Sequence, residues 1–396
     1  MWRRLLPIVV VIGCSHRDDS APAPAVQQGS PAGIQNSSPA PIAESVTLPT
    51  TFPGIRRDIT AIAGKATHVA IGDLDGDGKA ELVIADAAAL RVYDRADREI
   101  ASMPAEAGIQ QLVVEDLRGD HHAEIIAGWG LTREHRDGKA KVTIHRLAGD
   151  KLVDEVVAAP TTTRQDIAAI VGMPGNPAQL LIAYFESKYD VAATIATRGA
   201  TSWSLAPVAT IRMATSWARG DVDGDGKPDL VVGRLYGDTK EAAGDAFILR
   251  DATRIPIPTT RGVHGLAIAN LGDGKTELLL GDGWHQNYGA YAKGLVTSAR
   301  WSEGAFHATP IEDTAGQYAI MKILVADLDG DGHPEIVTQG NAYVRVYKRV
   351  GEAWKGVTVA GVVRDIAVGN LDGLPGDELV TLGDRSEVIS LHDVNW

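Results

Sequence analysis

The stretch GDLDGDGKAELVIAD, residues 72–86, places aspartates at positions 73, 75 and 77 and a glutamate at position 81. Nearly the same string returns as GDVDGDGKPDLVV at 220–232 and as ADLDGDGHPEIV at 326–337. Apolar residues alternate before the first of these loops, over 68–71, and form a continuous run after it, over 82–85. Both patterns are typical of β-strands. The sequence therefore predicts a strand–acidic loop–strand unit that recurs along the chain.

Alignment on the first loop position gives seven copies, spaced by about 50 residues. The copy that starts at Val171 has no acidic residues, and three others keep part of the pattern. A third strand follows each pair, and often a fourth, which is the composition of a β-propeller blade. The seven copies start at Asp73, Asp116, Val171, Asp221, Asn270, Asp327 and Asn370.

We therefore predict an all-β fold, a seven-bladed β-propeller that spans residues 51–396. The last copy ends after its third strand, at 386–394, and the segment at 54–62 has no blade of its own. An N-terminal strand that closes the last blade would leave no open sheet edge, and natural sheets avoid such edges. The alternative is an open solenoid of β-repeats, which has no use for these two spare segments.

The N-terminus has the pattern of a bacterial secretory signal. Arg3 and Arg4 precede an apolar run that ends near Ile12, and residues 1–13 are predicted as a lipoprotein signal peptide. Residues 11–14, VIGC, resemble a lipobox, in which Cys14 is lipidated; the alternative is an ordinary secretion signal with an incidental cysteine. Cys14 is the single cysteine, so no internal disulfide forms.

Residues 14–50 are rich in Pro, Ala and Ser and poor in large apolar residues, which predicts a disordered tether. We expect a protein of the cell envelope that is held at the membrane by a lipid anchor only and faces the periplasm or the cell surface. The tether would hold the folded part away from that membrane.

The acidic loops are predicted to bind calcium, which prefers six to eight oxygen ligands. An EF-hand is excluded because position 12 of these loops is Ile84, Val232 or Thr338 instead of glutamate. The alternative is that the aspartates only form polar turns. The predicted ligands are Asp73, Asp75, Asp77, Glu81 and the carbonyl of Lys79; Asp221, Asp223, Asp225, Asp229 and the carbonyl of Lys227; and Asp327, Asp329, Asp331, Glu335 and the carbonyl of His333.

The partial copies are weaker candidates. Asn370, Asp372 and Glu378 give a possible fourth site, although Leu374 takes the fifth loop position. The copy at Asp116 carries Arg118, whose charge disfavours a metal, and the copy at Asn270 has one residue deleted. We therefore expect three to four Ca²⁺ ions.

Strand, DxDGDGxx[DE] loop and strand in sevenfold repetition resemble the FG-GAP/VCBS repeats of the integrin α-subunit propeller and of bacterial surface proteins. The likeness covers about residues 55–396, but the Phe-Gly and Gly-Ala-Pro portions that name the family are missing. The resemblance implies that calcium is structural and clamps the hairpin between the first two strands of a blade.

A ligand site is expected on the face opposite or beside the acidic loops, near the central channel. Polar residues stand at the heads of most inner strands, and the loops between second and third strands are aromatic. Aromatic planes suit sugar rings or protein partners. The alternatives are that strand ends are simply polar and that the aromatics cover the apolar faces of the blades. The ligand-binding candidates are Trp129, Tyr236, Trp284, Tyr288, His68 and His264, and the polar ring adds Gln111, Asp166, Ser216, Lys322 and Asp365.

The net charge of −13 argues against a nucleic-acid partner. The sequence has no nucleophile elbow, zinc-spaced histidine cluster or phosphate loop, so we do not expect an enzyme. We predict a monomeric, calcium-stabilised binding module that recognises a glycan or protein ligand at the cell surface. The alternatives are a carbohydrate-active lyase or hydrolase on a propeller scaffold and a purely structural role.

Overall fold

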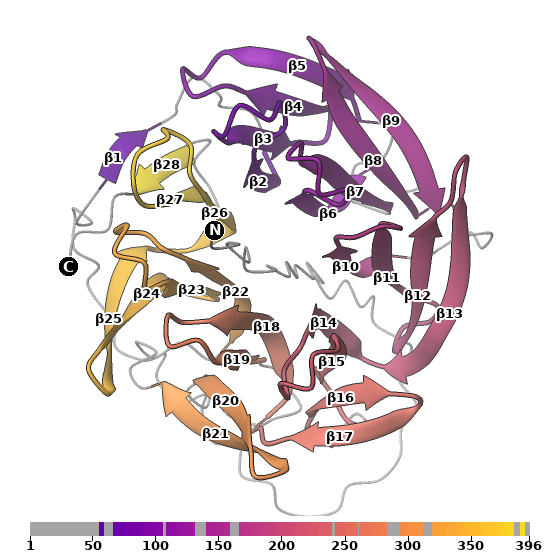
Figure 1. Cartoon of the computed structure of the whole chain (residues 1–396), viewed down its shortest axis with the longest axis vertical. Helices are drawn as coiled ribbons and strands as arrows, with labels where there is room; N and C mark the ends of the chain where they lie inside the picture. Colours follow the sequence, from indigo (N-terminus) through magenta and orange to yellow (C-terminus); the bar gives the residue numbers. More distant parts are fainter. Residues whose placement is uncertain are drawn as a thin grey trace, which may run out of the picture.

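A computed structural model describes residues 55–58, 66–105, 108–130, 140–158, 166–239, 242–259, 261–283, 294–311, 319–383 and 389–392 of the chain. These residues form seven four-stranded antiparallel sheets arranged around a common centre (Figure 1). The signal peptide and tether predicted for residues 1–50, with Cys14, lie outside the described residues.

Six sheets are each made of four consecutive strands, and we number them blades 1–6. Blade 1 holds β2 (His68–Gly72), β3 (Glu81–Ala85), β4 (Ala89–Tyr93) and β5 (Glu99–Pro104). Blade 2 holds β6 (Gly108–Glu115), β7 (Glu124–Gly130), β8 (Lys141–Ala148) and β9 (Lys151–Ala158). Blade 3 holds β10 (Ile167–Met173), β11 (Gln179–Phe185), β12 (Asp190–Arg198) and β13 (Trp203–Arg212).

The second half of the ring repeats this order. Blade 4 holds β14 (Ala214–Gly220), β15 (Asp229–Arg234), β16 (Ala246–Arg250) and β17 (Thr253–Ile257). Blade 5 holds β18 (Val263–Asn270), β19 (Thr276–Asp282), β20 (Val296–Ser302) and β21 (Ala305–Ile311). Blade 6 holds β22 (Ile320–Ala326), β23 (Glu335–Gly340), β24 (Val344–Val350) and β25 (Ala353–Ala360).

The prediction of seven blades is corrected to six blades of consecutive strands, because the seventh sheet is composite. It joins β26 (Val363–Gly369), β27 (Glu378–Gly383) and β28 (Ile389–His392) to β1 (Ile55–Asp58) from the other end of the chain. Blades formed by consecutive strands therefore number six, because the last sequence copy supplies only three strands. The seventh sheet gains its fourth strand from the antiparallel pairing of Ile55 with His392 and of Asp58 with Ser390.

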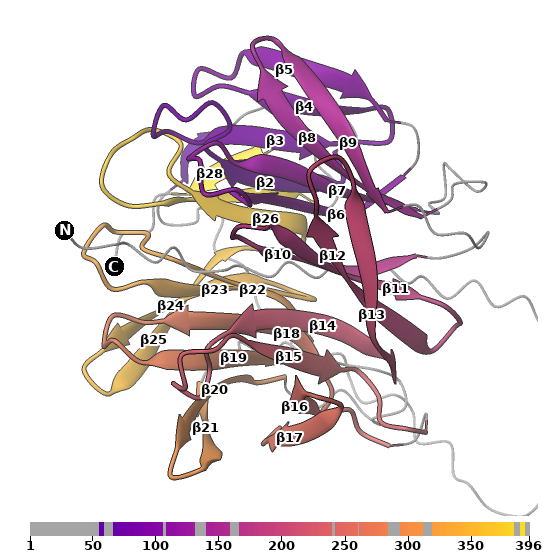
Figure 2. The same cartoon turned by 45° about the vertical axis from the view of Figure 1, so that its right-hand side comes forward.

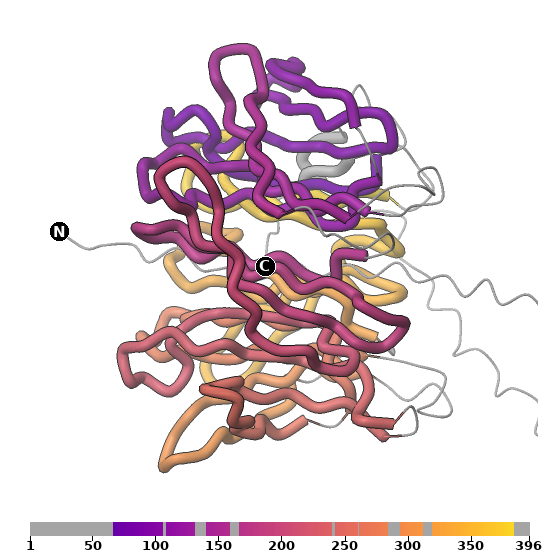
Figure 3. Tube along the Cα trace, turned by 90° about the vertical axis from the view of Figure 1, so that its right-hand side faces the viewer, coloured from indigo at the N-terminus to yellow at the C-terminus, as the bar shows by residue number. Residues whose placement is uncertain are grey.

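The ring closes through the first strands of the sheets. Each first strand contacts the first strands of both neighbouring sheets, and β26 of the seventh sheet contacts β2 of blade 1. We call this contact between the seventh sheet and blade 1 the seam. Figure 3 shows the assembly from the side, with the hairpins of blades 2 and 3 toward the viewer.

The burial of each strand follows its place in the sheet. Every residue of β3, β7 and β23 is buried, because these second strands have a neighbour on each side and adjacent sheets on both faces. Small residues such as Ala168 and Ala218 occupy the crowded inner strands, whereas Trp217 of β14 and Phe247 of β16 pack in the core cluster shared by blades 3 to 5. The apolar runs of the sequence are therefore explained by packing between sheets.

We expect closure by β1 to be measurable as stability. A chain that begins at residue 61 lacks β1 and leaves an edge of β28 unpaired, whereas a chain that begins at residue 51 keeps β1. The shorter chain should melt several degrees lower and self-associate more, as measured by thermal unfolding and sedimentation. Equal melting temperatures for the two chains would contradict a stabilising role for the composite sheet.

Candidate functional site

The three complete acidic loops connect the first and second strands of blades 1, 4 and 6. In blade 1, Asp73 accepts hydrogen bonds from the backbone N–H of Gly76 at 2.7 Å and of Gly78 at 2.9 Å. Both glycines have positive φ, 78° and 83°, which other residues adopt only at a cost. The glycines thus let the loop wrap around the Asp73 carboxylate.

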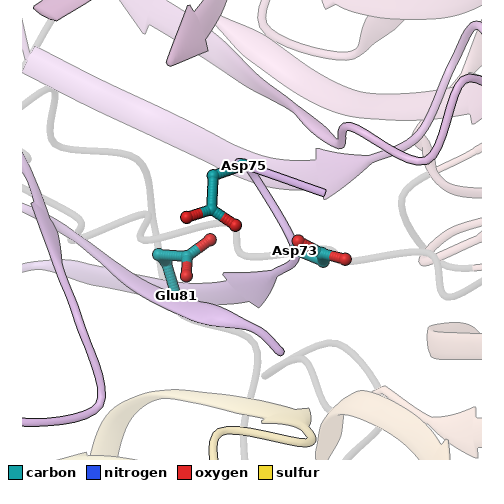
Figure 4. Close-up of side chains that lie close together, drawn as sticks. All are labelled: Asp73, Asp75 and Glu81. Carbon is teal, nitrogen blue, oxygen red and sulfur yellow. The ribbon is translucent and has the colours of Figure 1, made fainter. Parts of the chain in front are cut away.

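Glu81 closes the first loop from the start of β3. It is 6% exposed, and its Oε2 accepts a hydrogen bond from the Leu74 N–H at 2.8 Å. Oxygen atoms of Asp73, Asp75 and Glu81 lie within 4.8 Å of one another, and Figure 4 shows the three carboxylates close together. Burial, followed by the nearby carboxylates, raises the pKa of Glu81 to about 7. A cation among these oxygens would relieve their repulsion.

Blades 4 and 6 bring acidic groups together in the same way. The carboxylates of Asp327, Asp329 and Glu335 form one group, and those of Asp221, Asp223 and Asp225 form another. Glu335 Oε1 is buried and lies 3.3 Å from Lys348 Nζ, and the buried Asp327 Oδ1 receives no hydrogen bond from the described residues. Several hard oxygen donors around a buried carboxylate fit a divalent cation such as Ca²⁺.

The remaining predicted ligands are less uniform. Asp77 and Asp331 are exposed and lie outside these groups, and Asp229 is also outside its group. The N–H groups of Lys79, Lys227 and His333 each donate to the aspartate two positions earlier at 2.8 Å. A metal role for their carbonyls stays a prediction.

The partial copy at Asn370 uses its polar groups to hold the loop. The Asn370 side chain donates to the carbonyls of Leu374 and Gly376, at 2.5 and 3.0 Å, and accepts from the Gly373 N–H. Asp372 and Glu378 likewise accept backbone N–H groups. No converging acidic group is found here among the described residues, so a fourth ion remains a prediction.

Sequence reasoning missed the cations that reach these loops from the third strands. Arg250 bonds Asp223 and Asp229 in blade 4, and Lys348 bonds Asp329 and Asp331 in blade 6. Arg118, expected to disfavour a metal in blade 2, lies 2.9 Å from Glu124. Side chains along a strand alternate between its two faces. Counting in twos along each third strand would therefore have identified the cations that face the loop.

The acidic loops share one face of the ring, because backbone hydrogen bonds join them to each other. The Ala123 N–H donates to Asp73 O at 2.7 Å, and the Ala80 N–H donates to Asn370 O at 3.0 Å. The Asp377 N–H donates to Asp327 O at 2.7 Å. Loops of neighbouring sheets are therefore directly connected through their backbones.

The polar ring on the opposite face joins adjacent sheets, which corrects its assignment as a ligand site. Lys322 and Asp365 are 3% and 5% exposed and form an ion pair at 2.6 Å between blade 6 and the seventh sheet. Asp365 also accepts the Val69 N–H of blade 1 at 3.0 Å. Ser216 donates to the His264 carbonyl at 2.7 Å.

The two histidine candidates lie among these contacts. His264 is buried, and burial lowers its pKa to about 4. His68 is half-buried, with its Nδ1 3.0 Å from the Thr67 hydroxyl. Gln110, next to Gln111 on the same strand, donates to Asp166 at 2.8 Å. Contacts between neighbouring sheets explain why these strand ends are polar. The sequence alone does not show which strand ends face one another, so it does not specify these contacts.

The aromatic candidates that the structure describes are core residues, which corrects their assignment as ligand contacts. Trp129 is 1% exposed, and its indole N–H donates to the Thr143 hydroxyl at 2.6 Å. Tyr236 is buried in the cluster shared by blades 3 to 5. Trp284 and Tyr288 lie outside the described residues. The aromatics that are described cover the apolar faces of the blades.

An apolar groove opens between blades 2 and 3. Its lining includes Val142, Ala158, Ile167, Ile182, Tyr184 and Leu205. Ile167 is the first residue of β10, and the far end of β10 leads into the loop that corresponds to the acidic loops of other blades. The groove therefore lies toward the face of the ring opposite the acidic loops. Leu205 is 51% exposed, and Val153 and Val156 of the neighbouring β9 are more than half exposed. Figure 2 shows β9 and β13 as the outer strands of their blades.

No helix of a length and apolarity that could cross a bilayer occurs in the described part of the chain.

Comparisons with known proteins support the fold. A model of the FG-GAP repeat matches residues 214–249, which include β14 and β15 and the acidic loop between them. A search of curated proteins gives no match. The repeat match and the ring of sheets together support an FG-GAP-type propeller.

Solved structures of similar shape are distant in sequence. The crystal structure of BBS1N in complex with ARL6DN, soaked with mercury, is 14% identical, with a TM-score of 0.54 over 87% of this chain and 97% of that chain. The lead-soaked form is 13% identical, with a TM-score of 0.56 over 86% and 97%. The Dos1 propeller is 12% identical, with a TM-score of 0.50 over 84% and 79%. At these identities the likeness shows the propeller fold alone.

The Lys322–Asp365 pair provides a test of the structural role of the polar ring. Asp365→Ala leaves the buried Lys322 ammonium without its partner and should cost about 3–5 kcal/mol of unfolding free energy. The double variant K322M/D365L replaces both charges and should recover most of that loss in urea titrations. A D365A variant as stable as the wild type would show that the pair does not hold the sheets together.

Proposed function

We propose that this chain is a calcium-stabilised propeller that binds a macromolecular ligand at the cell envelope. The observation that carries this proposal is the division of the ring into two faces. Acidic loops with converging carboxylates occupy one face, and an exposed apolar groove opens toward the other. Propellers commonly present ligand sites on such a ring.

Calcium has a structural part in this proposal. Asp73, Asp75 and Glu81, and the corresponding groups of blades 4 and 6, would hold the ion by their carboxylates. A bound ion neutralises clustered negative charge and connects the end of a first strand to the start of the second. Because the loops hydrogen-bond their neighbours, the stabilising effect extends between blades.

The groove favours a protein ligand over a glycan. Its lining is mainly aliphatic, with one aromatic residue, Tyr184, and two polar ones, Lys141 and Thr194, whereas sugar sites favour several aromatic planes with polar neighbours. BBS1N, a structure of similar shape, is in complex with the protein ARL6DN. We therefore propose that the binding surface is the groove between blades 2 and 3, with Leu205 in its lining.

The envelope location in this proposal rests on the N-terminal sequence. Arginines, a short apolar run and Cys14 are followed by a Pro-rich segment. A lipid on Cys14 would anchor the propeller by one end and leave it free to meet a partner.

Calcium removal provides the first test. A site filled at one hundred times its dissociation constant adds about 2.7 kcal/mol of stability. The melting temperature should therefore fall when a calcium-selective chelator is added to the protein and should recover on adding excess Ca²⁺. The same chelator should have a smaller effect on E81Q/E335Q. A melting temperature that does not respond to the chelator would contradict structural calcium.

The groove provides the second test. Leu205→Asp places a charge on the apolar surface and should weaken capture of a cross-linked envelope partner at least tenfold, as measured by quantitative cross-linking in cells. Val350→Asp, on a similarly exposed valine of blade 6 outside the groove, is the matched control and should bind normally. A glycan panel, with products analysed by mass, accompanies this test. Glycan binding that L205D leaves intact would overturn the assignment of the groove to a protein ligand.

A further inference from the structure

One position near the end of the third strand differs in charge among blades 1–6. This position lies opposite the ninth loop residue on the neighbouring second strand. The register follows from the pairing of Leu82 with Tyr93 in blade 1 and of Ile336 with Tyr347 in blade 6. In four blades the position is a cation that contacts the acidic loop of its own blade. These cations are Arg146 in blade 2, Arg250 in blade 4, Arg300 in blade 5 and Lys348 in blade 6.

The cations of blades 4 and 6 lie among the predicted calcium ligands. Arg250 is 2.9 Å from Asp223 and also bonds Asp229. Lys348 is 2.7 Å from Asp331 and 3.3 Å from Glu335, and also bonds Asp329. Each loop thus already has a positive charge at carboxylates that a divalent ion would use.

Blade 1 has the opposite charge at this position, which is occupied by Asp94. The Asp94 carboxylate accepts the N–H groups of Ala96 and Arg98, at 2.9 and 3.0 Å, and stays in its own hairpin. Blade 3, whose loop has no acidic residues, has the neutral Thr197, which accepts a hydrogen bond from Gln179 at 3.0 Å. Among the six blades made of consecutive strands, blade 1 alone combines an acidic loop with no third-strand cation. In the seventh sheet the same register puts residue 393 at this position, which lies outside the described residues.

Glu81 is the buried member of the acidic group in blade 1. This side chain is more than nine-tenths buried and is directed at Asp73 and Asp75. Leu74 donates to one of its oxygens, and no hydrogen bond or ion pair to the other is found among the described residues. Lys79 pairs with Asp77 at 3.3 Å, at the exposed end of the loop.

Calcium must displace a fixed cation in blades 4 and 6 but not in blade 1. Displacement breaks charge-assisted hydrogen bonds and leaves two positive charges close together, both of which lower affinity. We propose that the third-strand cation substitutes for calcium in blades 4 and 6, so that the loop of blade 1 is the tight calcium site. This inference rests on the calcium binding proposed above and assigns that binding unequally among three loops of nearly identical sequence.

The place of this loop gives the tight site a specific role. Ala80, in the loop, donates to Asn370 of the seventh sheet, and Asp73 accepts from Ala123 of blade 2. The loop of blade 1 therefore lies at the seam. Calcium bound there stabilises the one contact where the two ends of the ring meet.

Competition against a fluorescent calcium chelator tests the inference on the full chain. The wild type should bind one ion at least tenfold more tightly than any other, and E81Q should lose that ion. K348Q should gain a second tight ion, and K348Q/R250Q a third. Lys355→Gln, an exposed lysine that pairs with Lys348 across the strands, is the matched control and should leave the number of tight ions at one.

The outcomes separate this inference from the proposal on which it rests. Three ions of equal affinity in the wild type, or an unchanged number of tight ions in K348Q, would overturn the inference and leave structural calcium in place. Absence of calcium binding in the wild type and in K348Q/R250Q would overturn both. The test does not depend on E81Q alone. If E81Q failed to fold, the number of tight ions bound by K348Q would still support or overturn the inference.

Discussion

A ring of sheets holds together only if its last member meets its first, and both faces of the ring have contacts for that purpose at the seam. On one face, the Ala80 N–H donates to Asn370 O. On the other, Asp365 accepts the Val69 N–H, and Arg364 donates to the Ala66 carbonyl at 3.0 Å. Lys322 neutralises Asp365 from blade 6. The pairing of β1 with β28 then completes the outer part of the sheet.

The repeat and its acidic loops could be predicted from sequence because both are local. Alternating aspartates and glycines specify the turn, and the apolar run that follows specifies a buried strand. Trp129 and the pair Lys322–Asp365 could not be assigned in this way. Their roles depend on which sheet lies opposite, and a strand pattern gives two faces without saying what covers each one. The composition of the seventh sheet could not be predicted locally either, because it depends on the pairing of β1 with β28 from opposite ends of the chain.

The third-strand cations show how a repeated scaffold can differ from blade to blade. Loops that look equivalent by motif have different surroundings, since Arg250 and Lys348 approach two of them and Asp94 stands at the matching place in blade 1. The backbone of the blade is kept in each case, and the charge that stabilises its turn differs. A motif count alone therefore does not describe how the charge of each loop is balanced.

The composite sheet also imposes an order of events on the chain. β1 leaves the ribosome, or crosses a membrane, before any other strand, yet its partner β28 is the last strand to appear. Blades 1 to 6 pair strands that are adjacent in sequence and can form one after another during synthesis. β1 therefore cannot pair with β28 until the whole chain has been made, and the outer edge of the seventh sheet is the last part of the fold that can be completed.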